Sequence, residues 1–203
     1  MNKFDLRFQK TEDLIIKAFL ECAAETDLEK IRIKDICARA SISRNAFYAH
    51  YADKYELLES VCESLETKMA NGLTPAVISM MSKNQLNEST DWCVGMVYEN
   101  REILRILANC SEERLRALLV GVFIEGTLKA LYDRPELILS DPKLNMAANA
   151  VTNLLVSSLL LWLQHIDDIS RDEMISFVRT YMHEPCILLY RQINAHPGIV
   201  AKF

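Results

Sequence analysis

Four polar side chains within residues 43–50 are of the types that read nucleic acid. Arg44 can fork onto the O6 and N7 atoms of guanine, and Asn45 can pair with the edge of adenine. Tyr48 and His50 can each hydrogen-bond a phosphate oxygen, which fixes orientation without reading sequence. We therefore interpret residues 43–50 as a short helix whose outer face fits the major groove of double-stranded DNA.

The preceding residues predict the rest of a helix-turn-helix. Apolar side chains in residues 33–40 recur three and four positions apart, so they share one face of a first helix. They are Ile33, Ile36, Cys37 and Ala40. Ser41 and Ile42 form the tight connection, and Ser43 can accept a backbone N–H at the start of the second helix.

Basic charge concentrates on this element although the whole chain carries a formal net charge of −5. Residues 30–54 hold six cations against two acids, a local charge of +4. A negative total argues against indiscriminate binding of nucleic acid, so the distribution matters more than the sum. Lys34 and Arg39 either contact phosphate or form the solvated face of the first helix. Tyr48 and His50 likewise contact phosphate, or serve as a half-buried aromatic and a helix cap.

A third helix begins just after the recognition segment. Asp53 and Glu56 form an acidic variant of the capping box, which places Lys54 in the first helical turn. A cation there opposes the helix dipole, unless the ammonium and the free N–H groups converge on one DNA phosphate. The candidate DNA-binding residues are Lys34, Arg39, Ser43, Arg44, Asn45, Tyr48, His50 and Lys54.

Residues 10–61 resemble the amino-terminal domain of the TetR family of bacterial transcriptional regulators. The pattern around the recognition helix carries the resemblance through Phe47, Tyr48, His50, Tyr51 and Lys54. The family's first helix has an apolar face, which Ile15, Ala18, Phe19 and Cys22 supply here. The resemblance implies a carboxy-terminal half that dimerises and binds effectors. Ser41, Arg32 and Asp27 depart from the Gly, Thr and Gly that the family favours at these positions.

The fold class is predicted as all-α, because helical patterns continue beyond residue 60 without strand alternation. We expect a three-helix DNA-binding domain over residues 1–52 and a helical effector-binding and dimerisation domain over residues 53–203. A helix starting near residue 53 joins them and is expected to stop at Asn71 and Gly72. A polar loop over 82–89, helices over 90–100, 101–109 and 111–132, and a break at 133–135 are expected to follow.

The last two predicted helices suit a dimer interface. Residues 144–166 contain no charged side chain, and the stretch is long enough to admit a transmembrane interpretation. Their Asn, Ser, Thr, Gln and His residues are costly in hydrocarbon, so we favour a helix buried by its own domain and by a partner chain. The final helix, 171–194, should be kinked or interrupted at Pro185. Together the two helices predict a four-helix interface of a homodimer, without a membrane.

Five bulky or unexpectedly polar residues are candidates for an effector pocket: Trp92, Met96, Phe123, Glu125 and Trp162. The aromatic members are equally typical of ordinary core. Glu125 lies between Gly121 and Gly126 and faces either a cavity or solvent.

No catalytic or metal-binding pattern stands out. The six cysteines form no C-x-x-C pair, and His165 with Asp167 and Asp168 is better explained as a solvated helix end. We expect no cofactor, no metal and no enzyme activity, and a cytoplasmic location since no signal sequence is recognisable. Free cysteines are mostly buried, which leaves a redox-sensing thiol as a minor alternative.

The favoured function is a dimeric, sequence-specific regulator of transcription that binds a palindromic operator and, as a repressor, is released by a small-molecule effector. One recognition helix offers few contacts, whereas two related by a two-fold axis read half-sites about 34–36 Å apart. The alternative is a TetR-like co-regulator that acts mainly through a protein partner.

Overall fold

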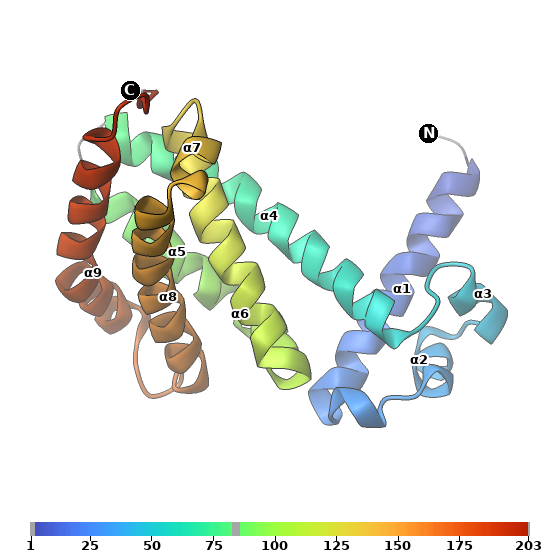
Figure 1. Ribbon diagram of the computed structural model, residues 1–203. Coiled ribbons are helices and arrows are strands. Elements are labelled where there is room, and N and C mark those ends of the chain that lie inside the picture. Colours follow the sequence, from blue (N-terminus) through green and yellow to red (C-terminus); the bar gives the residue numbers. More distant parts are fainter. Residues whose placement is uncertain (1–2, 83–85, 203) are drawn as a thin grey trace.

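The computed structural model describes residues 3–82 and 86–202, which form two helical bodies joined by one long helix (Figure 1). The amino-terminal body contains α1 (Lys3–Glu25), the short 3-10 helix η1 (Leu28–Lys30), α2 (Ile33–Ala40) and α3 (Arg44–Tyr48). The linking helix α4 (Lys54–Ser82) leads to α5 (Leu86–Glu99), α6 (Arg101–Leu131), α7 (Pro135–Ser140), α8 (Pro142–Gln164) and α9 (Arg171–Asn194). The predicted all-α class is confirmed.

The linking helix is longer than predicted. Residues 71 and 72 lie inside α4, which continues to Ser82. Gly72 does not end the helix. It allows α4 and the indole ring of Trp92 on α5 to lie close together, since a Cβ atom added at Gly72 would be 3.0 Å from that ring. The predicted loop over 82–89 is also wrong where the structure describes it, since α5 begins at Leu86.

Helix α6 consists of two helical segments that meet at Ser111. The backbone of Ser111 is extended, with φ −164° and ψ 99°, and its hydroxyl accepts the N–H of Arg114 at 3.2 Å. A serine in this role is an N-cap, so it begins the second segment. The predicted break between helices at this position is confirmed, although no loop separates them.

The carboxy-terminal helices are capped as their sequences suggest. Asp141 accepts the N–H groups of Lys143 and Leu144 at 2.9 Å, and Ser170 forms a full capping box with Glu173. α7 was not predicted. Pro185 was expected to kink or interrupt α9; the interruption is wrong, since Pro185 lies inside the helix. A proline removes one hydrogen bond of the helix, and the packing of α9 on α5 and α8 maintains the rest.

Helix α8 is long and apolar enough to cross a membrane by length and composition, but it lies within the carboxy-terminal helices (Figure 1). Its buried face includes Val156, Leu159 and Trp162, and it packs on α6 and α9. The Trp162 indole N–H donates to the carbonyl of Ile169 at 2.8 Å, which fixes the turn between α8 and α9. Only 33% of the apolar stretch is buried, and exposed apolar side chains such as Met146 and Leu161 remain on this helix.

Candidate nucleic-acid interface

The turn between α2 and α3 sets the angle of the recognition helix. Ser41 adopts the left-handed conformation with φ 55° and ψ 42°, and Ile42 donates its N–H to the carbonyl of Cys37 at 3.0 Å. This closes α2 in the way glycine usually does. The Ser43 hydroxyl then accepts the N–H of Ala46 at 3.1 Å and starts α3. Phe47, which is fully buried, anchors the short helix in the core.

Four of the candidate side chains are exposed. Arg44, Asn45 and Tyr48 lie on α3, with Tyr48 54% exposed, and Lys34 is exposed on α2. Within residues 3–82 and 86–202, the structure records no hydrogen bond or ion pair of these four side chains. Their donors are therefore free to bind a partner.

Arg39 is engaged inside the protein instead. Its guanidinium forms an ion pair with Glu25, which joins α2 to the end of α1. The hydrogen bond from Arg39 lowers the pKa of the Glu25 carboxyl, and the same bond raises the pKa of Arg39. Lys30 is likewise paired, with Asp27 at 2.6 Å. Part of the basic charge noted in the sequence is thus neutralised by neighbouring acids.

His50 packs against the first helix. Its ring stacks on Phe8 with the centroids 3.8 Å apart and the planes at 25°, and its Nδ1 atom is buried without a hydrogen bond to any described residue. One face of the imidazole is covered by α1. Its neighbour Tyr51 is tied to the same helix, because the Tyr51 hydroxyl donates to Glu12 at 3.1 Å.

Lys54 has a different set of partners from the one expected. Its ammonium donates to the carbonyls of Leu28, Glu29 and Ile31 at 2.8, 3.0 and 3.1 Å. An ammonium has three N–H donors, so the structure leaves none free for phosphate. The expected acidic cap beside it is present, since Asp53 accepts the N–H of Glu56 at 2.9 Å.

Arg32 was not among the candidate residues, although it belongs with them. It is the N-cap residue of α2 and is exposed. No hydrogen bond or ion pair of its side chain is recorded among the described residues. A basic residue directly before the first helix of a helix-turn-helix is the signal that could have identified it.

The five candidate pocket residues do not come together. Trp92 and Met96 line one cavity of about 420 Å³ between α4, α5 and the start of α9. Phe123 and Trp162 are buried in the core, outside that lining. Glu125 is exposed and pairs with Lys129 at 2.7 Å, so it faces solvent.

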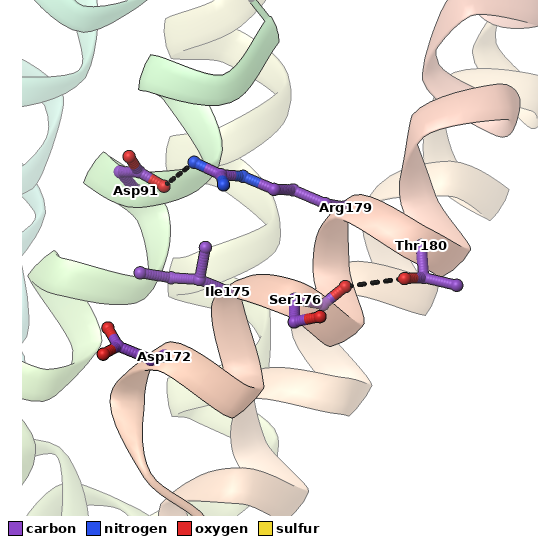
Figure 2. A pocket seen from close by; sticks show the side chains of 6 residues that line it. All are labelled: Asp91, Asp172, Ile175, Ser176, Arg179 and Thr180. Atoms are coloured by element: carbon purple, nitrogen blue, oxygen red, sulfur yellow. Dashed lines mark hydrogen bonds and ion pairs between the residues drawn. The ribbon is translucent and has the colours of Figure 1, made fainter.

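Charged side chains surround the cavity that Trp92 and Met96 line. Gly95 allows the guanidinium of Arg171 to lie close to α5, since an added Cβ would be 2.9 Å from that group. A neighbouring cavity of about 380 Å³ lies between α5 and α9 (Figure 2). Asp91 borders both cavities and pairs with Arg179 at 2.6 Å. Both cavities are therefore polar at the rim, and the first has an aromatic wall.

Among the described residues, no group of three or more His, Cys, Asp or Glu side chains converges as a metal site would require. All six cysteines are free. Burial raises the pKa of the Cys62 thiol to about 11 and that of Cys93 to about 12. Thiols with such pKa values are poor nucleophiles, which fits small core residues.

Residues 15–61 match the family model of the bacterial regulatory proteins of the tetR family. The uncharacterized HTH-type transcriptional regulator YxbF of Bacillus subtilis (strain 168) is 24% identical over 103 residues. That match covers 50% of this chain and 27% of the relative, so the chain spans little more than a quarter of that protein's length.

Two solved structures share the fold. A TetR transcriptional regulator from Streptococcus agalactiae 2603V superimposes with a TM-score of 0.62 at 18% identity, covering 88% of this chain and 96% of that one. A TetR-like transcriptional regulator from Rhodococcus sp. RHA1 gives a TM-score of 0.57 at 17% identity, over 92% and 97%. The capped α3 lies within residues 15–61, so the match to the tetR family of bacterial regulatory proteins covers the helix-turn-helix and the helices that pack on it.

Proposed function

We propose that the protein is a homodimeric regulator that reads a palindromic operator and represses transcription until a small-molecule effector releases it. The observation that carries the proposal is the exposed face of α3, whose polar side chains have no partner among the described residues. Arg44 and Asn45 can form the bidentate contacts that distinguish guanine and adenine, while Tyr48 and Lys34 hold the phosphate backbone. The proposed DNA-binding domain is residues 1–52, and residues 53–203 form the effector-binding and dimerisation domain.

Dimerisation is supported by apolar side chains left exposed on the last two long helices. On α8 they are Met146, Leu154 and Leu161, which are 71%, 47% and 60% exposed. On α9 they are Phe177, Tyr181 and Leu188, at 40%, 60% and 58%. Their spacings of four, seven and eight residues place each set on one helical face. Since α8 and α9 pack side by side, two copies related by a two-fold axis can cover both faces.

Burial by a second protomer also accounts for the length and apolar character of α8 without a membrane. A four-helix contact of this kind would place the two copies of α3 on the same side of the dimer. We propose a cytoplasmic location, where an operator is accessible.

The effector site that the structure supports best is the cavity beside Trp92 and Met96. It borders α4, the helix that leads to the DNA-binding domain, through Lys68, Met69 and Gly72. A ligand that binds one tilt of α4 better than another would shift the equilibrium between the two tilts, and with it the spacing of the two recognition helices. The free energy of that shift equals the difference in the ligand's binding free energy for the two states. The aromatic wall and charged rim favour a small molecule with both apolar and polar groups.

Selection from a random DNA pool at near-physiological salt, followed by sequencing, tests the proposal. We expect a palindromic site, and Arg44→Ala should relax preference at one base pair of each half-site with a loss of about 1–3 kcal/mol per contact. Lys143→Ala is the matched control, because Lys143 is exposed on α8 and distant in the fold from α3. Failure of a folded dimer to enrich any sequence would favour the co-regulator alternative.

The oligomeric state is tested by sedimentation. Tyr181→Asp should convert the dimer to a monomer and reduce operator affinity by roughly the 10²–10⁴ that bivalent binding adds. Val200→Asp changes another exposed apolar residue, 66% exposed and outside both helices, and should leave the dimer intact. A monomeric wild-type protein would refute the dimer.

A further inference from the structure

The first turn of α4 is attached to the segment just before α2. The ammonium of Lys54 lies within hydrogen-bonding distance of the carbonyls of Leu28, Glu29 and Ile31. Leu28 and Glu29 belong to the 3-10 helix η1, and Ile31 is the residue that follows it; the Leu28 carbonyl also accepts the N–H of Ile31 at 3.1 Å. Lys54 is half-buried, so these bonds are only partly exposed to competing water.

Tyr55 attaches to the same segment. Its hydroxyl donates to both carboxylate oxygens of Glu29, at 3.2 and 3.1 Å, and this hydrogen bond raises the pKa of Tyr55. The Lys54 ammonium lies 5.3 Å from the centroid of the Tyr55 ring, within the range of a cation–π contact. Two consecutive residues of α4 therefore contact one short segment, residues 28–31, Lys54 through its backbone and Tyr55 through the Glu29 side chain.

Residues 28–31 lie directly before the helix-turn-helix. Arg32, the N-cap residue of α2, follows them directly. A few residues along α4, Glu59 is held by Arg114 of α6. The start of α4 is thus joined to the DNA-binding helices on one side and to the carboxy-terminal helices on the other.

We propose that Lys54 is a positioning residue: with Tyr55 it joins α4 to residues 28–31, so that the helix-turn-helix turns with α4 as one body. Lys54 binds no phosphate in this role. The proposal rests on the proposed function, because rigid coupling matters only where the tilt of α4 sets the position of α3. It differs from the phosphate role that the position of Lys54 in the sequence suggested.

Salt dependence separates the two roles. Each phosphate contact releases counterions and adds about 0.9 to the slope of log affinity against log salt. Lys54→Met keeps most of the side-chain volume and removes the donors. We expect it to lower operator affinity by roughly tenfold, the size of one lost base contact, with an unchanged slope. Lys34→Met, the matched control on α2, should reduce the slope by about 1.8 in a dimer, since each protomer loses a phosphate contact.

Amide hydrogen exchange in the absence of DNA provides a second readout. Lys54→Met should speed exchange in residues 28–33, and Tyr55→Phe should do so less, without any change of charge. This result is expected even if the wild-type protein binds no selected DNA, so the coupling can be judged separately from the proposed function. A slope that falls in Lys54→Met as it does in Lys34→Met would overturn the proposal, and so would unchanged exchange in both α4 variants.

Discussion

The ion pair between Glu59 of α4 and Arg114 of α6 should stabilise the protein measurably. Arg114 Nε donates to both carboxylate oxygens at 2.9 and 2.8 Å, and a terminal nitrogen donates at 2.6 Å. The side chains are 48% and 33% exposed, so water screens the pair. A forked, charge-assisted contact between helices exceeds a simple surface pair, and we expect a coupling of about 1 kcal/mol.

A double-mutant cycle measures this coupling. Glu59→Gln, Arg114→Met and the double variant are unfolded in urea at pH 7 and at one fixed protein concentration, because a dimer's stability depends on concentration. The pair formed by Glu112 and Arg116 within α6, at 3.0 Å, is the matched control. As an exposed pair four residues apart, it should give a coupling of only about 0.3–0.5 kcal/mol.

The pH dependence of the coupling follows from the pKa of Glu59. The hydrogen bond from Arg114 lowers this pKa in the folded state. The contribution of Glu59 is therefore fully present above its unfolded pKa of about 4.3 and is lost as the pH falls through the lower folded value. A coupling equal to that of the control pair at pH 7, or one that persists undiminished at pH 2, would refute the reasoning.

Three further predictions concern backbone and core positions. Gly126→Ala should destabilise the protein by about 1 kcal/mol, because the new Cβ would lie 2.6 Å from a methyl carbon of Leu73. Gly121→Ala should stabilise the protein by about as much, because an added Cβ there meets nothing within 4 Å. Equal effects of the two variants in urea unfolding would contradict this. Ser41→Gly should raise stability by about 1 kcal/mol, as seen in thermal unfolding, because Ser41 occupies left-handed backbone. The Cys93 thiol, with its pKa raised by burial to about 12, should react with a thiol reagent at pH 8 only on unfolding; prompt labelling of the native protein would show that it is accessible.

The helix-turn-helix could be predicted from sequence because local chemistry determines it. The apolar spacing of residues 33–40 and the hydroxyl of Ser43 act within a few residues of one another, and the structure places both as expected. The same holds for the break at Ser111, where a side-chain cap starts a new helical segment.

Long-range contacts explain what the sequence did not predict. In the sequence Gly72 resembles a helix stop, but in the structure the indole of Trp92, twenty residues later, packs against it. In the sequence Lys54 resembles a phosphate ligand, but in the structure its ammonium donates to the carbonyl of Leu28 in η1. Of the candidate pocket residues, only Trp92 and Met96 share a cavity, because helical spacing does not determine which helices meet.

The recognition helix α3 has only five residues, too few to be stable alone. Its shape is imposed by Phe47 and by the helices that bury it. A genetic screen for loss of operator binding should therefore return many substitutions at core positions such as Ile15, Phe19 and Leu57, which touch no DNA. Such variants would resemble contact mutants in the cell, and lower the temperature at which DNA binding fails. Growth at a reduced temperature should restore DNA binding in them but not in variants of Arg44.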